Sequence, residues 1–261
     1  MKIASLYRYP VKGLSPEPLE SAELRAGSYF PGDRLYAIEN GPSGFDANTP
    51  QHQPKIKFLM LMRNEALARL RTRYEDETTT LVIESPEFQT VRADVTTEEG
   101  RLAVEAFMRR YVPDALRGPP KVLAAPEGFR FTDARSGFVS IINLASITAI
   151  GEMVERPIDP LRLRGNVLVD GLEPWAEFDL VGKILAGPSG TRLKITRRIP
   201  RCAATQVDPT TGLRDLDIPA ALMRDLGHVD CGIYAEVLTS GKLATGETLA
   251  VEPERQGQLA V

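Results

Sequence analysis

The residues with the most evident chemical capacity lie around position 202. Cys202, one of two cysteines in the chain, closely follows Arg197, Arg198 and Arg201. Positive charge near a thiol favours the thiolate form, which acts either as a nucleophile or as a ligand for a soft metal. A free cysteine can equally be a small, inert core residue. The pattern therefore indicates a reactive thiol, a metal ligand or a core position.

A stiff turn follows this cysteine. Asp208-Pro209 fixes one backbone dihedral angle, and Gly212 permits a conformation that other residues avoid. A sulfur atom held between a basic strand end and a rigid loop is typical of a ligand site. The remainder of the chain must supply the elements that hold this loop in place.

The composition is that of a packed, turn-rich protein. The chain has 261 residues, of which 43% are hydrophobic, and this is enough for two ordinary domains or one large one. Its 21 glycines and 20 prolines favour many short strands over a helical bundle. We therefore predict an α+β fold in which antiparallel strands dominate.

Several function classes are disfavoured by the same numbers. A net charge of −3 argues against a general nucleic-acid binder, which usually has a basic face. Two cysteines do not make a disulfide framework and fit a reducing cytosol. The N-terminus lacks an apolar signal core, and the longest apolar tract, residues 138–154, is interrupted by polar residues. These features predict a cytoplasmic protein with no membrane segment.

The first half of the chain is predicted to be mainly β-structure. A helix is expected from Asn64, with Leu67, Leu70 and Tyr74 at helical spacing. A second helix is expected from a capping box at Thr96 and Glu99 to about residue 111. Strands are predicted at 2–9, 19–24, 34–39, 57–62, 80–84 and 90–95.

A cluster of prolines and glycines after Pro113 marks the predicted domain boundary. We expect an N-terminal domain over residues 1–118, a second domain over 119–255 and a polar tail over 256–261. The second domain is predicted to have short helices at 143–151 and 218–226. Strands are predicted there at 166–169, 183–186, 192–198 and 232–238, with further strands ending near residue 251.

The segment that begins at Cys202 resembles the core of the MOSC domain, a family that includes the amidoxime-reducing components. In that family a cysteine followed by Thr-x-Val-Asp-Pro-x-Thr-Gly coordinates the molybdenum of a pterin cofactor. The matching residues here are Cys202, Thr205, Val207, Asp208, Pro209, Thr211 and Gly212. The resemblance implies a β-rich MOSC N-terminal domain, a C-terminal MOSC β-barrel and a cofactor in the cleft between them.

The same resemblance assigns cofactor-binding roles near the N-terminus. Pro10-Val11-Lys12 resembles the start of the family's first domain, where the lysine helps to hold the cofactor. Relatives often have serine at the next position, so Gly13 contributes only its backbone N–H. Asp33-Arg34 resembles a pair whose arginine reaches the cofactor, and a guanidinium can grip a phosphate or a pterin edge at two points. Without the resemblance, each of these is an ordinary surface residue.

Further site residues are implied in the C-terminal half. Arg162-Leu163-Arg164-Gly165-Asn166 resembles the family's Arg-Phe-Arg-Pro-Asn element, in which the second arginine and the asparagine contact the cofactor. These positions are Arg164 and Asn166, and an asparagine amide matches the amide edge of a pterin. The resemblance also places Arg201, Thr205, Asp208 and Tyr234 at the cofactor or near the metal.

Two other chemistries use the same cysteine. Cys202, Cys231 and His228 could suggest a zinc site, but the fourth ligand would have to be the distant His52. Cys202 with His228 and Asp230 supplies the residue types of a cysteine hydrolase. No local peptidase signature accompanies them. We expect Cys231 to be buried and inert, and Trp175 to be structural.

The function implied by the resemblance is binding of the molybdenum cofactor (molybdopterin) through Cys202. The implied reaction is a two-electron reduction of N-hydroxylated substrates such as amidoximes or hydroxylamines. A fused iron–sulfur domain would need about four cysteine ligands, so electrons must come from a separate flavin, haem or iron–sulfur protein. The alternatives are a carrier of the cofactor or of its sulfurated form, and a MOSC fold without cofactor.

Overall fold

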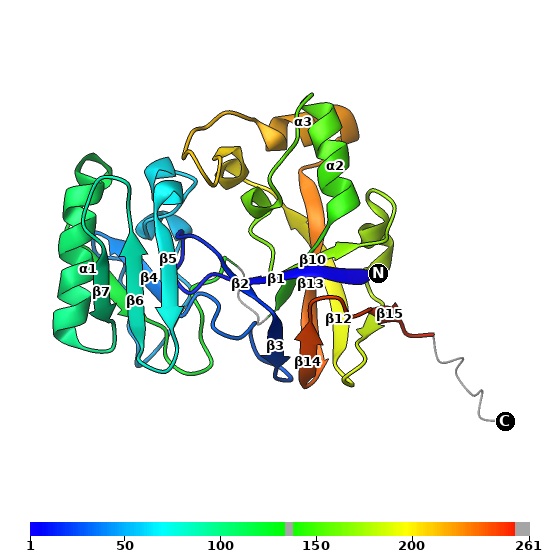
Figure 1. Ribbon diagram of the computed structural model, residues 1–261, viewed down its shortest axis with the longest axis horizontal. Helices are drawn as coiled ribbons and strands as arrows, with labels where there is room; N and C mark the ends of the chain where they lie inside the picture. Colours follow the sequence, from blue (N-terminus) through cyan, green and yellow to red (C-terminus); the bar gives the residue numbers. More distant parts are fainter. Residues whose placement is uncertain (134–137, 254–261) are drawn as a thin grey trace.

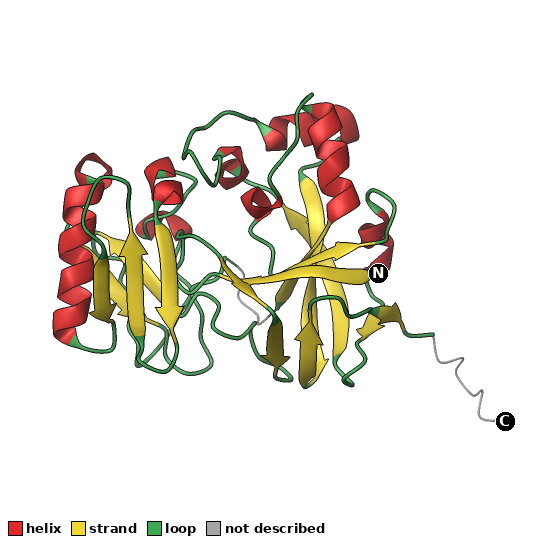
Figure 2. Ribbon diagram, in the orientation of Figure 1, coloured by secondary structure: helices red, strands yellow, loops and turns green. Residues whose placement is uncertain are grey.

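The computed structural model describes residues 1–133 and 138–253, which form two packed bodies (Figures 1 and 2). The N-terminal body contains small sheets and the longest helix. The C-terminal body is built on one large, curled sheet. The predicted α+β class with mostly antiparallel strands is confirmed.

The large sheet has eight strands and curls into a half-barrel. All neighbouring strands are antiparallel except β9 and β10, which run parallel. In spatial order the strands are β15 (Ala250–Val251), β11 (Ile184–Ala186), β12 (Arg192–Pro200), β13 (Asp230–Thr239), β9 (Val139–Asn143), β10 (Val167–Asp170), β1 (Lys2–Arg8) and β2 (Glu17–Leu19). A separate pair, β3 (Ser21–Leu24) and β14 (Gly241–Ala244), packs its apolar residues into the same core.

Two apolar clusters stabilise this body. The first includes alternate residues of the large sheet, such as Ile3, Val169 and Ile195. The second lies beneath helices α2 (Leu144–Met153) and α3 (Ile218–Leu226). Trp175 packs against both clusters, so the single tryptophan has the structural role expected of it.

The N-terminal body has its own core. It contains the pair β4 (Tyr36–Asn40) and β8 (Pro120–Ala124), the sheet β5 (Arg71–Glu75), β6 (Thr80–Glu84) and β7 (Val91–Asp94), and helix α1 (Glu98–Tyr111). Val104, Phe107 and Met108 recur at helical spacing and bury one face of α1 in this core.

Short 3-10 helices connect the strands at several points, and three of them shape the site described below. These six helices are η1 (Lys55–Lys57), η2 (Glu65–Arg69), η3 (Pro113–Ala115), η4 (Pro160–Leu163), η5 (Ala176–Leu180) and η6 (Ala203–Gln206). In the described part of the chain, no helix is long and apolar enough to cross a bilayer.

The segment from residue 57 to 75 differs from its prediction. Residues 57–62 are not a strand, since only Phe58 bridges to β4, and their apolar character reflects burial alone. The helix expected from Asn64 is wrong as well: a 3-10 turn is followed at once by β5. Asn64 does not cap this turn, because its Oδ1 accepts a hydrogen bond from the Met60 N–H (3.1 Å).

Two smaller differences concern element boundaries. The α1 cap is Thr97, whose hydroxyl accepts from the Gly100 N–H, whereas the Thr96 hydroxyl donates to Asp94. Strand β9 was not predicted, because its five buried residues merge with the apolar start of α2.

Each body contains residues from outside its own half of the chain. Strands β1 to β3, from the first 24 residues, belong to the sheets of the C-terminal body, whereas β8 pairs with β4 in the N-terminal body. The boundary expected between residues 118 and 119 stays a prediction, and the tail expected at 256–261 lies outside the described residues.

Candidate functional site

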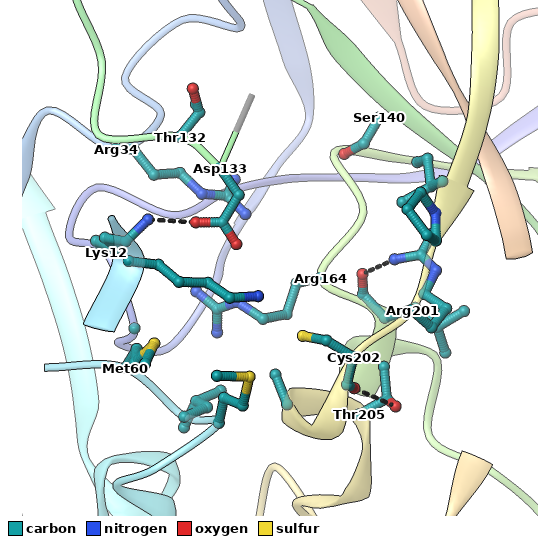
Figure 3. A pocket seen from close by; sticks show the side chains of 18 of the residues that line it. Lys12, Arg34, Met60, Thr132, Asp133, Ser140, Arg164, Arg201, Cys202 and Thr205 are labelled. Atoms are coloured by element: carbon teal, nitrogen blue, oxygen red, sulfur yellow. Dashed lines mark hydrogen bonds and ion pairs between the residues drawn. The ribbon is translucent and has the colours of Figure 1, made fainter. Parts of the chain in front are cut away.

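A cavity of about 160 Å³ lies between the two bodies and contains most of the predicted site residues. Its walls come from the loop after β1, the segment around Met60, residues 131–133, the η4–β10 connection and the end of β12 (Figure 3). The predicted residues in its lining are Lys12, Gly13, Arg34, Arg164, Asn166, Arg201, Cys202, Thr205 and Tyr234.

Cys202 lies where β12 ends and η6 begins. Its carbonyl accepts hydrogen bonds from the Thr205 N–H (3.0 Å) and hydroxyl (2.9 Å), which close the turn. The side chain is half-buried and points into the cavity (Figure 3). Thr205 is buried and acts through this turn, because its hydroxyl is already engaged by the Cys202 carbonyl.

One of the three arginines that precede Cys202 in the sequence reaches the cavity. The Arg201 guanidinium donates to the carbonyls of Leu163 (2.8 Å) and Cys231 (2.7 Å). Arg197 lies over the Tyr234 ring and Arg198 over the ring of Phe178, and neither lines the cavity. Of the three cations that precede Cys202, only Arg201 therefore places its charge in the cavity lining.

Lys12 is buried on the wall opposite the cysteine. Its Nζ donates to the Phe131 carbonyl (3.0 Å) and pairs with the Asp133 carboxylate (2.5 Å). Burial lowers the pKa of Lys12, although Asp133 opposes this effect. Burial would raise the pKa of Asp133, but the Lys12 charge and hydrogen bond bring it below its ordinary value.

Gly13 has a conformation that excludes a side chain. Its φ is +82°, and an added Cβ would lie 2.8 Å from the Leu59 carbonyl oxygen. This contact and the positive φ explain why glycine stands here. The residue can offer a ligand only its backbone, as the sequence predicts.

Arg34 and Arg164 both lie against the ring of Tyr9. Each guanidinium carbon is 4.3 Å from the ring centroid, and each arginine has a positive φ. Arg34 also pairs with Asp33 (2.5 Å), whose carboxylate accepts from the Tyr9 N–H (2.8 Å). The ring thus contacts two like charges, and cation–π attraction to it offsets part of their cost.

Arg164 has no carboxylate partner among the described residues of the cavity. Its guanidinium forms no hydrogen bond or ion pair with another residue of the described ranges, and its recorded contact is the Tyr9 ring. Burial and repulsion from Arg34 lower the pKa of Arg164 to about 10, so it remains charged at neutral pH. Arg164 is half-buried, and a partly desolvated cation without an anionic partner is costly, which makes this position suited to an anionic ligand.

The lining as a whole is cationic. The charge of Arg162 is neutralised by its ion pairs with Asp208 and Asp215. The other charged side chains in the described lining are five cations and two carboxylates, namely Lys12, Lys55, Arg34, Arg164 and Arg201 against Asp33 and Asp133. The cavity therefore attracts anions.

Asn166 lines the cavity, but much of its amide is already engaged. Its Oδ1 accepts from the N–H (3.2 Å) and hydroxyl (2.8 Å) of Ser140, and its Nδ2 donates to the Tyr7 carbonyl (3.1 Å). The side chain ties β9 and β1 to the start of β10. One amide hydrogen remains for a ligand. The predicted match to a pterin edge would use both a donor and an acceptor of this amide.

Asp208 is not among the lining residues. Its Oδ1 accepts from the N–H groups of Thr210 (2.9 Å) and Thr211 (2.7 Å), and its Oδ2 pairs with Arg162 (2.9 Å). The predicted position near the metal does not agree with this geometry, because the carboxylate shapes the loop after Cys202. Tyr234, in contrast, lines the cavity beside Phe138, and burial raises its pKa.

The residues of the two rival chemistries are not assembled around Cys202. Cys231 is fully buried, and burial raises its pKa to about 12. The Nδ1 of His228 accepts from the Asp230 N–H (3.1 Å), and the ring packs on Phe178, outside the cavity lining. Over residues 1–133 and 138–253, no group of three or more His, Cys, Asp or Glu side chains could hold a metal.

Several residues that shape the site were not predicted from the sequence. Tyr9 supports two arginines, Asp133 pairs with Lys12, and Arg162 holds the cysteine loop from within. Each of these side chains contacts residues that are distant in the sequence, so its neighbours along the chain give no sign of the contact. Arg162 could have been found from the sequence, because it is the first residue of the Arg-x-Arg element that also contains Arg164.

Two family models match this chain. The MOSC domain matches residues 129–250, and the MOSC N-terminal beta barrel domain matches residues 1–112. Because the two matches together span most of the sequence, the protein belongs to the MOSC domain family and carries its N-terminal β-barrel domain.

The chain is also similar to two solved structures. The YuaD protein from Bacillus subtilis is 16% identical, with 97% of this chain and 96% of that chain covered and a TM-score of 0.45. YiiM from Geobacillus stearothermophilus is 18% identical, with 46% of this chain and 56% of that chain covered and a TM-score of 0.36. Among curated proteins there is no significant match.

Proposed function

We propose that this MOSC protein binds the molybdenum cofactor, with Cys202 as the protein ligand of the metal, and reduces N-hydroxylated compounds. The observation that carries the proposal is the meeting of a half-buried thiol and an excess of cations in one cavity. The cations come from both bodies of the protein, and the cysteine lies within the part matched by the MOSC domain.

The donor set suits this cofactor. A thiolate is a ligand that soft metals prefer, and a phosphate is gripped well by guanidinium groups. Arg164 and Arg34, stacked on Tyr9, would hold the phosphate or the pterin together with Lys12. Arg201 would add positive charge next to the thiolate.

The residues around the cavity have separate tasks in the proposed reaction. When bound, the cofactor would supply the two-electron couple that breaks the N–O bond. The reduction consumes two electrons and two protons and gives the N–H product and water. Tyr234 keeps the proton on its Oη at neutral pH, because burial raises its pKa, so it can donate a hydrogen bond to a substrate oxygen. Met60 and Leu163 provide apolar walls that limit water.

We propose that the electrons come from a separate protein. The proposal assigns that role to a separate flavin, haem or iron–sulfur protein, since the two cysteines cannot hold a cluster. We further propose that both proteins work in the cytoplasm.

The first test measures cofactor content. Molybdenum analysis and pterin fluorescence on the purified protein should show both components in the wild type, with molybdenum largely lost in Cys202→Ser. Cys231→Ala is the matched control, because that sulfur is buried outside the cavity, and it should retain the metal. Equal molybdenum in the wild type and Cys202→Ser would refute the proposal.

A second test separates the enzyme from the carrier. Loaded protein supplied with a chemical electron donor should convert benzamidoxime to benzamidine. Transfer of cofactor to an apo-enzyme without this turnover would instead support a carrier.

A further inference from the structure

The loop that follows Cys202 and η6 crosses from the C-terminal body to the N-terminal body (Figure 1). It is closed by an antiparallel bridge between Val207 and Arg214 and by a hydrogen bond from the Asp208 N–H to the Leu213 carbonyl (2.8 Å). These contacts make residues 207–214, the bridging loop, a compact unit.

Arg214 joins the two walls of the cavity directly. Its Nη1 donates to the carbonyl of Ala203 (3.2 Å), the residue after Cys202. Its Nη2 donates to the carbonyls of Leu61 (3.0 Å) and Met62 (2.9 Å), both of which line the opposite wall, and lies 3.1 Å from the Glu65 carboxylate. One guanidinium therefore connects the turn that presents the thiol with the wall that faces it.

Other contacts place the bridging loop tightly on the N-terminal body. Gly212 packs so closely on η2 that an added Cβ would lie 3.0 Å from Arg69 Cγ and 3.1 Å from the Glu65 carbonyl oxygen. Arg71 donates to the Pro209 carbonyl (3.1 Å). The contact is therefore close-packed at Gly212, and Arg214 acts at its solvent-exposed rim.

The other side of the bridging loop is fixed to the C-terminal body. Arg162, 4% exposed, donates to the Gln206 carbonyl (3.0 Å) and pairs with Asp208 (2.9 Å) and Asp215 (2.7 Å). Any displacement of the N-terminal wall relative to the thiol must therefore break the contacts of Arg214, because Arg162 prevents the loop from following.

We propose that Arg214 is a positioning residue that sets the separation between the thiol of Cys202 and the cavity wall formed by residues 60–62. It is not among the residues that line the cavity and acts mainly through backbone carbonyls on both sides. Its effect on a bound cofactor rests on the proposed function, whereas its effect on access to the thiol does not. Arginine suits the role, because its planar fork offers several donors in fixed directions, which lysine lacks.

The test compares Arg214→Gln and Arg214→Lys with Arg156→Gln. Arg156 is the matched control, because it is half-exposed and pairs with Asp215 next to the same loop (2.7 Å), without touching the N-terminal wall. In the protein without cofactor, modification rates are measured for iodoacetamide and for a bulky maleimide under native conditions. Modification is counted at Cys202 by mass spectrometry.

Loss of Arg214 should open the cavity more to the large reagent than to the small one. We expect the maleimide rate, divided by the iodoacetamide rate, to rise about three- to tenfold in Arg214→Gln. Arg214→Lys should restore part of the difference, and Arg156→Gln should match the wild type. Hydrogen exchange at residues 61–65 should accelerate only in the Arg214 variants.

An unchanged rate ratio in Arg214→Gln, or an equal rise in Arg156→Gln, would overturn the positioning role. General destabilisation would instead accelerate exchange throughout the protein and expose Cys231 as well. In loaded protein, the rate of molybdenum loss on dilution should rise in Arg214→Gln. If the wild type holds no molybdenum, the proposed function fails, and the thiol measurements still decide the role of Arg214.

Discussion

At the scale of single residues, the site depends on cations kept charged in a buried place. Lys12 and Arg164 both have pKa values lowered by burial, and the value for Arg164 falls to about 10. Tyr9 offsets part of the cost for Arg164 by cation–π contact. An anionic ligand would offset more of it, so anion affinity and the protonation of these two residues are linked.

This linkage predicts how the affinity for an anion depends on pH. Sulfate is a suitable probe, because its charge is constant over the range. Binding requires Lys12 and Arg164 to be protonated, so the affinity should fall as pH rises and Lys12, whose pKa is lowered, and Arg164, whose pKa is about 10, lose their protons. Isothermal titration calorimetry at several pH values measures it.

The control for this prediction removes one cation. Arg164→Met should weaken sulfate binding about tenfold at neutral pH and flatten the decline near pH 10. Arg34, whose pKa is raised, and Asp133, whose pKa is lowered, face the same group and stay ionised over this range, and Tyr9, with a pKa of about 12, stays neutral. An affinity that rises above pH 9 would contradict the linkage.

Much of the site could be predicted from residue types and family resemblance, because those residues lie next to recognisable motifs. Cys202, Lys12, Arg34 and Arg164 meet in one cavity. Asp208 could not be placed in this way, since a carboxylate after a cysteine looks the same whether it faces a metal or caps a turn. Arg214 left no signal, because its partners are mostly backbone carbonyls and its one carboxylate partner, Glu65, is distant in the sequence.

At the scale of elements, the loop after β1 depends on a glycine. Gly13→Ala would combine a positive φ with a Cβ 2.8 Å from the Leu59 carbonyl oxygen. We expect a loss of about 1–3 kcal/mol in the free energy of unfolding, together with weaker sulfate binding, because Lys12 is displaced. Urea denaturation measures the first effect and calorimetry the second.

Gly128→Ala is the control for this substitution. Gly128 also has a positive φ (+72°), but an added Cβ would meet nothing within 4 Å. Gly128→Ala should therefore lose only the part of the free energy of unfolding that is due to backbone conformation. It should bind sulfate as the wild type does. Equal losses in the two variants would show that the close approach to Leu59 does not matter.

The sequence predicted elements well where local signals agreed with tertiary packing. Strand β6 and helix α3 have the predicted bounds, and α3 ends at Gly227, which has the left-handed conformation expected of a glycine cap. The helix predicted from Asn64 was wrong, because Leu67, Leu70 and Tyr74 have helical spacing by coincidence. The first belongs to a 3-10 turn, the second follows it, and the third lies in β5.

At the scale of the whole molecule, the start of the chain completes the C-terminal body. Strand β1 pairs with β10 and β2, and β3 pairs with β14. A fragment of residues 119–253 would expose the edge of β10 and lose Ile3, Leu6 and Leu24 from the first core cluster. We predict that this fragment has no cooperative thermal transition by circular dichroism.

The comparison for this fragment is a chain in which residues 1–26 are joined by a flexible linker to residues 126–253. It restores β1 to β3 and omits β8, which pairs with the N-terminal body. It should regain a cooperative transition. A sharp transition in the shorter fragment would mean that the C-terminal sheet is stable without its N-terminal strands.

The position of Trp175 has an optical consequence. The chain contains one tryptophan, and it lies between the two apolar clusters of the C-terminal body. Indole emission therefore reports on that body alone, whereas ellipticity sums over both. If the bodies melt separately, the two signals will trace different curves, and the unlabelled protein reveals the order in which they open.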